Sequence, residues 1–173
     1  MIEENQGSPI KTEKENRIVV SYRKFADLIN SQRIKIRTSS VIKQQWLNVS
    51  DRIDIRLRKE VFTGFPQGTD YTHTVKYRYN DTDCTEINTR LVKDQYDAIH
   101  DEFFKDIKTV NKMRLYIEIE NDNGNVAVNP NYDFVADLYE LDGEIKQVMI
   151  EAEKSRLSLP DFVFPDWLKG GNE

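Results

Sequence analysis

The chain has 173 residues, with 25 Lys and Arg against 30 Asp and Glu and a formal net charge of -5 at pH 7. This length favours one domain with a substantial core, and the negative balance argues against a general nucleic-acid-binding protein. No apolar run reaches the length of a membrane span, and Met1–Gln6 lacks the basic and apolar regions of a signal peptide. The single Cys84 cannot form an intramolecular disulfide, so we expect a cytoplasmic protein without a membrane partner.

The N-terminal residues are strongly polar, so we expect residues 1–16 to form a flexible tail before a domain that spans residues 17–170. In the first part of that domain, β-branched residues and the alternation of polar with apolar side chains indicate extended segments. The glycines and proline of residues 62–68 predict a loop. We expect a turn or short helix at 24–29 and strands at 17–22, 34–38, 40–47 and 52–58.

The second part of the domain contains the one clear amphipathic helix, because apolar residues recur at helical spacing over residues 93–108. A turn sequence joins two alternating segments into a hairpin before it, 71–79 and 84–91. Further strands are expected at 111–120, 132–138 and 145–153. Roughly eight strands with one or two helices are typical of a closed antiparallel barrel. A half-open sheet packed on helices is the alternative, and either fold is α+β and mainly β.

Charged side chains recur at every second residue of several predicted strands, and residues two apart in a strand share a face. One such strand indicates only a solvated face, whereas several, carrying both signs, predict a sheet around a polar interior. Cations would hold an anion there, and carboxylates would hold a metal ion. The sets are Arg56 and Arg58, Glu86 and Asn88, Arg114 with Glu118 and Glu120, and Glu151 and Glu153. Apolar residues fill the other face of the Arg56 strand, so we expect Arg56 and Arg58 to point inward.

An ordered series of short motifs between residues 17 and 170 resembles the CYTH superfamily, the triphosphate tunnel metalloenzymes. Each motif occupies its place in the order of strands that this family follows. The series reads Tyr22-Arg23-Lys24-Phe25, Gln44-Gln45-Trp46-Leu47, Arg56-Leu57-Arg58, Thr74-Val75-Lys76, Glu86-Ile87-Asn88, Lys112-Met113-Arg114, Asp137 before Gly143, Glu151-Ala152-Glu153 and Phe164-Pro165-Asp166-Trp167-Leu168-Lys169-Gly170.

The resemblance implies a closed or nearly closed eight-stranded antiparallel β-barrel, the triphosphate tunnel, with a few helices. Arg and Lys from different strands suit a triphosphate, and the candidates are Lys24, Arg56, Arg58, Lys76 and Arg114. Carboxylates are the ligands of Mg²⁺ or Mn²⁺, and the candidates are Asp137, Glu151, Glu153 and either Glu86 or Glu118. We expect Glu151 and Glu153 to be the catalytic carboxylates, because a water bound to the metal ion could attack the terminal phosphorus.

The chain departs from the family in its opening strand, where the two glutamates of the family fall on Val20 and Tyr22. Asn88 also stands at a position that is often acidic. Because the family's glutamates help to hold the metal ion, this departure weakens the expectation of catalysis more than that of phosphate binding. We assign no catalytic role to His73, His100 or Cys84.

We therefore predict binding of a triphosphate-bearing ligand, either a nucleotide, inorganic triphosphate or an RNA 5′ end, accompanied by metal-dependent hydrolysis. The alternative is a catalytically inactive module that sequesters a nucleotide or docks on a partner protein. Cyclisation of ATP, which one branch of the superfamily performs, is a third reading that no residue selects. A free strand edge would allow a homodimer.

Overall fold

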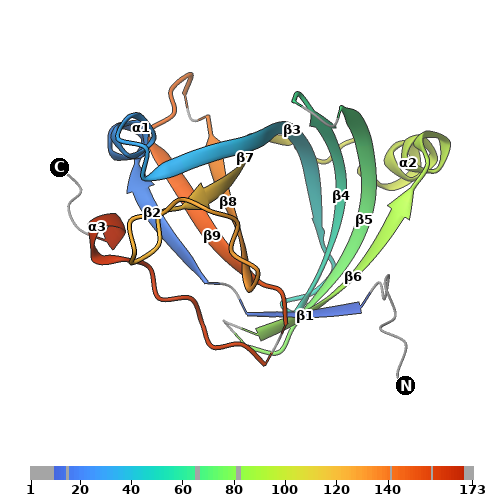
Figure 1. Ribbon diagram of the computed structural model, residues 1–173. Helices are drawn as coiled ribbons and strands as arrows, with labels where there is room; N and C mark the ends of the chain where they lie inside the picture. The colour runs from blue at the N-terminus through green and yellow to red at the C-terminus, as the bar shows by residue number, and fades with distance from the viewer. Residues whose placement is uncertain are drawn as a thin grey trace. The chain divides into compact units, whose positions relative to one another are not determined.

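The computed structural model describes residues 10–14, 16–64, 67–80, 83–140, 142–156 and 158–169. Strands dominate, with two short α-helices, a π-helical turn named η1 and a terminal helical turn (Figure 1). In chain order the elements are β1 Ile10–Lys14, β2 Arg17–Ser21, α1 Tyr22–Asn30, β3 Ile34–Asn48, β4 Ile53–Phe62, β5 Gly68–Arg78, β6 Asp83–Leu91, α2 Lys93–Ile99, η1 His100–Phe104, β7 Val110–Ile119, β8 Tyr132–Tyr139, β9 Gln147–Lys154 and α3 Asp166–Lys169.

The nine described strands follow the hydrogen-bonded order β1-β6-β5-β4-β3-β7-β8-β9-β2. The pairs β1·β6, β5·β6, β7·β8, β8·β9 and β2·β9 are antiparallel. The predicted, mainly antiparallel β fold is therefore confirmed. The predicted closed barrel of eight strands is not: the order has nine strands and ends at β1 and β2, so hydrogen bonds do not close the sheet within the described residues. Among those residues, no helix is long and apolar enough to cross a membrane.

The chain divides into two compact units, and β3 and β4 run through both. The first, which we call the α2 unit, comprises the described residues of 1–14, 43–60 and 69–110. The second, the α1 unit, comprises the described residues of 15–42, 61–68 and 111–173. In each unit the strands carry an apolar face, which packs against helices, and a polar face on the opposite side.

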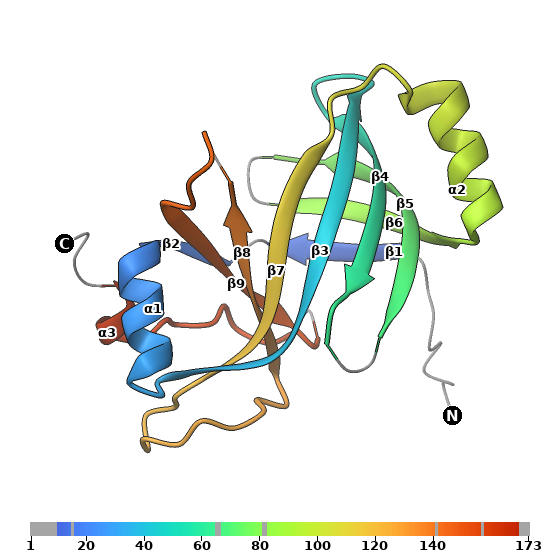
Figure 2. The ribbon, with the colours of Figure 1, turned by 90° about the horizontal axis from the view of Figure 1, so that it is seen from above.

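In the α1 unit, α1 and α3 pack on the apolar face, and both lie beside β2 (Figures 1 and 2). The Oγ of Ser21 caps α1 by accepting a hydrogen bond from the backbone N of Lys24 at 3.1 Å. The helix then buries Phe25 and Leu28, which are three residues apart and share one side of the helix. The core that they enter is formed by Val20, Ile34, Leu115, Ile117, Ile119, Phe134, Ala136, Leu138, Val148, Ile150, Ala152, Phe164 and Leu168.

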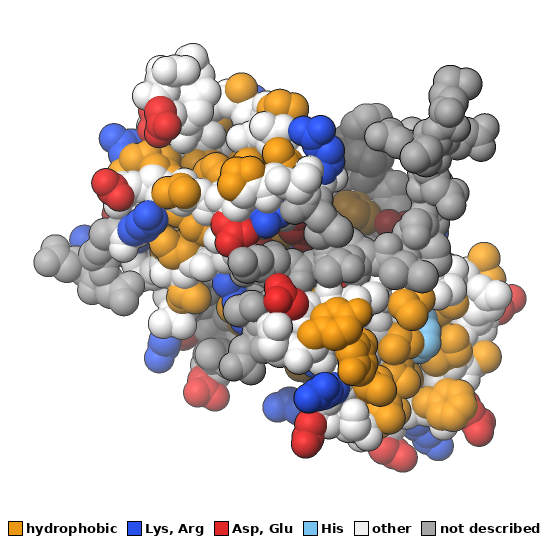
Figure 3. Space-filling view, turned by 90° about the horizontal axis from the view of Figure 1, so that it is seen from below, with side chains coloured by type: hydrophobic (Ala, Val, Ile, Leu, Met, Phe, Trp, Pro, Cys, Tyr) orange, Lys and Arg blue, Asp and Glu red, His pale blue; other side chains and the backbone are white. Residues whose placement is uncertain are grey.

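In the α2 unit, α2 lies beside β6 (Figure 2). A cavity of about 280 Å³ is lined by Leu47, Ile55, His73, Ile99, Phe103 and Phe104. Figure 3 shows hydrophobic side chains gathered at the lower right, over the part of the chain that carries α2. The helix predicted over residues 93–108 is present, but it changes to π-helical geometry at His100. The helix ends after η1, where the Nε2 of buried Gln45 donates to the carbonyl oxygens of Phe104 and Ile107, each at 2.7 Å, so these groups bind a side chain rather than a further helical turn.

Two elements differ from the segments expected from the sequence. The strands expected at 34–38 and 40–47 are one continuous strand, β3, because Ser40 is buried within it rather than exposed in a turn. Within the predicted tail, Ile10–Lys14 form β1, and each of its residues is in register with a residue of β6, from Ile10 with Ile87 to Lys14 with Asp83. Backbone pairing of this kind needs no hydrophobic pattern, which explains why the polar sequence did not predict it.

Candidate functional site

The polar face of the α2 unit gathers charged side chains from β4, β5 and β6. On β4, Arg56 and Arg58 alternate with the apolar Ile55 and Leu57. Ile55 lines the cavity beneath the helix, and Leu57 is fully buried. The period of two therefore directs both guanidinium groups to the face away from α2.

A chain of hydrogen bonds holds Arg56 on this face. Its Nη2 donates to the Oγ1 of Thr74 at 3.2 Å, and that hydroxyl donates to the Oδ1 of Asn88 at 2.6 Å. Thr74 and Asn88 are partners in the β5·β6 register, which places their side chains together. The guanidinium also lies over the ring of Trp46, 5.0 Å from its centroid. Arg56 is thus oriented by contacts on two sides.

Arg58 and Lys76 are held by neighbours on the same unit. The Nη2 of Arg58 donates to the Oε1 of Gln44 at 3.1 Å. The Nζ of Lys76 lies 3.4 Å from the Oε1 of Glu86, its cross-strand partner, and both side chains are almost completely buried. Desolvated ion pairs of this kind lose much of the screening that water provides. Glu86 consequently neutralises the charge of Lys76 on this face.

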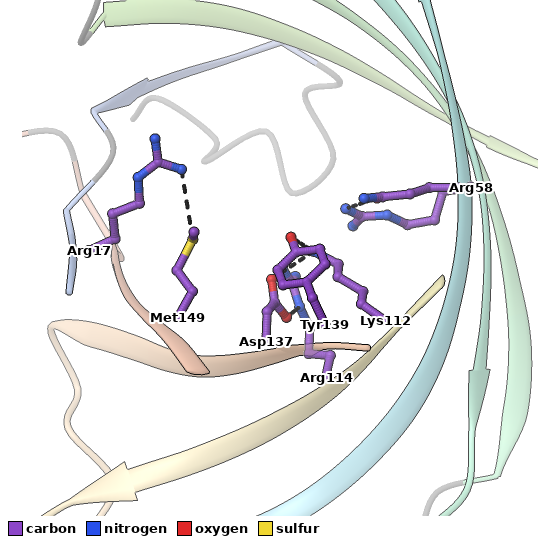
Figure 4. A network of polar contacts seen from close by, with 8 residues as sticks. Arg17, Arg58, Lys112, Arg114, Asp137, Tyr139 and Met149 are labelled. Atoms are coloured by element: carbon purple, nitrogen blue, oxygen red, sulfur yellow. Dashed lines mark hydrogen bonds and ion pairs between the residues drawn. The ribbon is translucent and has the colours of Figure 1, made fainter. Parts of the chain in front are cut away.

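The polar face of the α1 unit centres on a buried carboxylate, Asp137 of β8, which is 0% exposed. Arg114 of β7 donates to it in a bidentate manner, from Nε to Oδ1 at 2.7 Å and from Nη2 to Oδ2 at 2.8 Å. The Nζ of Lys112 donates to Oδ2 at 2.6 Å, and it also lies 3.4 Å from the hydroxyl of Tyr139 (Figure 4). Register explains the cluster, because Arg114 pairs with Asp137 and Lys112 with Tyr139 across β7 and β8. We call Lys112, Arg114 and Asp137 the buried triad.

The buried triad alters the pKa values of its members. Burial alone would raise the pKa of Asp137, but the hydrogen bonds and charges of Arg114 and Lys112 outweigh it, so this pKa lies below its usual value. Burial likewise acts to lower the pKa of Arg114, and Asp137 outweighs it, so the pKa of this guanidinium is raised. On the neighbouring strand, burial and the negative charge of Asp137 raise the pKa of Glu151. Asp137 therefore stays ionised at neutral pH, whereas Glu151 binds a proton more readily than an exposed glutamate.

The carboxylates predicted to hold a metal ion are distributed unevenly. Glu151 and Glu153 share one face of β9. Asp137 is already occupied, because both of its oxygens accept hydrogen bonds from cations. Glu86 belongs to the other unit, where it pairs with Lys76, and Glu118 lies 3.7 Å from the Nε of Arg37. No group of three metal-binding side chains comes together among the described residues.

Lys24, also predicted to bind phosphate, lies elsewhere. It stands in the first turn of α1, on the side of the sheet that holds the apolar core, and its Nζ donates to the carbonyl oxygen of Leu168 at 3.0 Å. The two positions at which the family's glutamates fall are also not on the polar face. Val20 is 2% exposed within the core, and Tyr22 begins α1.

Sequence reasoning did not select several residues of these two faces. Lys112 was part of a motif but was not chosen as a site residue, and Gln44 and Thr74 were also passed over. Arg17 is in register with Glu151, and its Nη1 donates to the Sδ of Met149 at 3.8 Å (Figure 4). The period of two would have placed Lys112 with Arg114 on one face, whereas Arg17 depends on the pairing of β2 with β9, which no local pattern predicts.

No family model matches the chain, and no curated protein has a significantly similar sequence. Among solved structures, the putative adenylate cyclase of Bacillus halodurans is 17% identical over 86% of this chain and 83% of its own, with a TM-score of 0.52. PH1819 of Pyrococcus horikoshii OT3 is 16% identical over 83% of this chain and 80% of its own, also at 0.52. The inorganic triphosphatase NE1496 is 18% identical over 91% and 85%, with a TM-score of 0.45. The chain therefore shares its fold with the first two of these structures.

Proposed function

We propose that this protein binds a triphosphate-bearing compound, such as a nucleotide, inorganic triphosphate or an RNA 5′ end. The observation that carries the proposal is the polar face of the α2 unit, where Arg56 and Arg58 are held in place by Thr74, Gln44 and Trp46. Guanidinium groups fixed in this way suit phosphate oxygens, which accept paired hydrogen bonds from Arg. Because these contacts exist without a ligand, binding would cost little ordering of side chains.

We further propose that the compound is hydrolysed with the help of a divalent metal ion. Glu151 and Glu153 of the α1 unit are the residues that would hold Mg²⁺ or Mn²⁺. When bound, such an ion neutralises phosphate charge and lowers the pKa of its water. A carboxylate of this pair would act as the general base that accepts a proton from that water molecule. Asp137 would position Arg114 rather than bind the metal ion, because both of its oxygens are occupied.

Replacing Glu151 with glutamine is expected to abolish metal-dependent phosphate release, because the amide keeps the size of the side chain but can neither bind the ion as an anion nor accept the proton. Phosphate release from inorganic triphosphate and from ATP, with Mg²⁺ and with Mn²⁺, measures this effect. Glu144→Gln is the matched control, since Glu144 is exposed in the turn before β9. Equal turnover in the Glu151→Gln and Glu144→Gln variants would refute the catalytic assignment.

One observation favours a second function, a binding module without catalysis. Val20 is buried in the core where the family places a glutamate, and the Asp137 carboxylate is neutralised by two cations. Stabilisation of the protein by triphosphate against heat, without phosphate release from any of the compounds above, would select this function. In that case the protein would sequester a nucleotide or present it to a partner protein or a second copy. We place either function in the cytoplasm, which suits the buried Cys84 outside any disulfide.

A further inference from the structure

The cavity of the α2 unit, which we call the α2 cavity, has no part in the function proposed above. Its volume is about 280 Å³, and it is lined by Leu47, Ile55, His73, Ile99, Phe103 and Phe104. Ile55 and Arg56 are neighbours in β4, so the cavity and the polar face lie on opposite sides of this strand. Protein interiors contain few voids larger than a water molecule, and an apolar cavity of this size is therefore a candidate ligand site.

The helical segment beside the cavity is attached to the sheet at both of its ends. Near its start, the ring of Tyr96 packs on that of Tyr71 of β5, with the ring centroids 4.9 Å apart. At its far end, the side chain of Phe104 is buried, and the carbonyl oxygen of this residue accepts a hydrogen bond from Gln45 of β3. No residue of α2 itself is buried. The helix therefore cannot close the cavity without giving up one of its attachments.

The π-helical turn η1 contributes two residues to the lining, Phe103 and Phe104. Turns of this geometry are rare, and they occur frequently at functional sites. Phe103 is 63% exposed although it lines the cavity. This combination places its ring at the mouth of the cavity, where a ligand would enter from solvent.

His73 alone is polar among these six lining residues. None of the described residues forms a hydrogen bond or an ion pair with its side chain. Burial lowers the pKa of His73, so its imidazole is uncharged at neutral pH and offers one N–H donor and one acceptor nitrogen. A single hydrogen-bonding group in an apolar wall is the arrangement by which ligand pockets orient what they bind.

The size and the lining of the α2 cavity define the class of ligand. An apolar cavity of about 150 Å³ holds a benzene molecule, so this larger one has room for roughly two fused rings. The lining offers no charged partner, and burying an unpaired ion is costly. We infer that the α2 cavity binds a neutral, mostly apolar organic molecule of this size, with a hydroxyl or similar group hydrogen-bonded to His73. This site is separate from the proposed phosphate site and does not depend on it.

Equilibrium dialysis against 2-naphthol and against naphthalene, which lacks the hydroxyl, tests this inference. Ile99→Trp and Leu47→Phe each add a ring to the lining, and each should weaken binding of 2-naphthol about tenfold or more, because the ring occupies the space of the ligand. His73→Leu keeps a similar side-chain volume and removes both hydrogen-bonding nitrogens. In this variant the affinity for 2-naphthol relative to naphthalene should fall about three- to tenfold, the net contribution of one hydrogen bond.

Val49→Trp is the matched control, because Val49 is an exposed residue of the same unit and does not line the cavity. This variant should bind 2-naphthol as the unaltered protein does. The inference is overturned if the unaltered protein binds neither probe up to its solubility limit. It is also overturned if Ile99→Trp and Leu47→Phe, each shown to be folded by circular dichroism, bind 2-naphthol as well as Val49→Trp does. A relative affinity that His73→Leu leaves unchanged overturns the hydrogen bond to His73. Triphosphate binding is measured separately and is expected to be the same in all of these variants.

Discussion

Replacement of Asp137 with alanine is expected to lower the free energy of unfolding by about 3–5 kcal/mol, because it removes one member of a buried ion cluster and leaves the others buried. Asp137 accepts three charged hydrogen bonds, two from Arg114 and one from Lys112. Both cations are almost fully buried and would lose this carboxylate while staying desolvated. Urea unfolding at neutral pH, followed by circular dichroism, measures the change.

Asp133 supplies the matched control for this experiment. It lies on the same strand and the same face as Asp137, but it is exposed. Asp133→Ala should change the free energy of unfolding by no more than about 0.5 kcal/mol. Equal effects of the two substitutions would mean that the buried triad contributes nothing particular to stability. If Asp137→Ala has the larger effect, Asp137→Asn, which keeps the shape of the side chain and removes its charge, separates the contribution of packing from that of electrostatics.

The same unfolding experiment over a range of pH should reveal two opposite contributions. The pKa of Asp137 is lowered in the folded state, so its stabilisation is complete above the unfolded value of about 3.9 and is lost as the pH falls through the folded pKa. The pKa of Glu151 is raised, so protonation of Glu151 stabilises the fold as the pH falls from this raised pKa toward about 4.3. Glu151→Gln should abolish the second contribution and leave the acid loss in place. An unaltered pH profile in this variant would contradict the assignment.

Removal of both Arg56 and Arg58 is the variant with the largest expected effect on ligand binding. Hydrogen bonds to charged groups contribute about 1.5–3 kcal/mol each, so Arg56→Ala combined with Arg58→Ala should weaken triphosphate affinity about 100-fold or more. Trp46 and Thr74 hold the Arg56 guanidinium in one orientation, so the lost affinity is that of a guanidinium already oriented before the ligand binds. Isothermal titration with inorganic triphosphate, at one fixed salt concentration, gives the affinity.

A control for this double variant must remove the same charge from the same unit. Arg52 and Arg90 are both exposed, and Arg90 pairs only with the partly exposed Asp70 at the surface. Arg52→Ala combined with Arg90→Ala should leave affinity nearly unchanged, because exposed ion pairs contribute little. If the two double variants bind triphosphate equally well, phosphate binding does not take place on the polar face of the α2 unit. Thermal unfolding of both variants checks that each is folded.

Strand positions and faces were largely predictable from the chain, and the helix at 93–108 was predictable up to its end. Alternation of Arg56 and Arg58 with Ile55 and Leu57 is sufficient to place the two arginines on one face, since the period of a strand is two. The end of this helix was not predictable, because the carbonyl oxygen of Phe104 accepts a hydrogen bond from Gln45, which is 59 residues away in sequence. The position of Lys24 was also not predictable, because the chain continues there as α1. This helix buries Phe25 and Leu28 against the apolar face of the sheet and so carries Lys24 to the same side.

The sequence by itself determined which residues share a face, that the fold is mainly β, and the order of motifs by which the chain resembles the CYTH superfamily. These properties follow from local periodicity and from short spacings. Only the tertiary structure decided which charges meet: Asp137 with Arg114, Lys76 with Glu86, and Arg17 opposite Glu151. Those encounters depend on strand register, which is set by the packing of a whole face, and a shift of one residue would turn every side chain to the other side. The carboxylate that the sequence offered as a metal ligand, Asp137, is for this reason a partner of two cations.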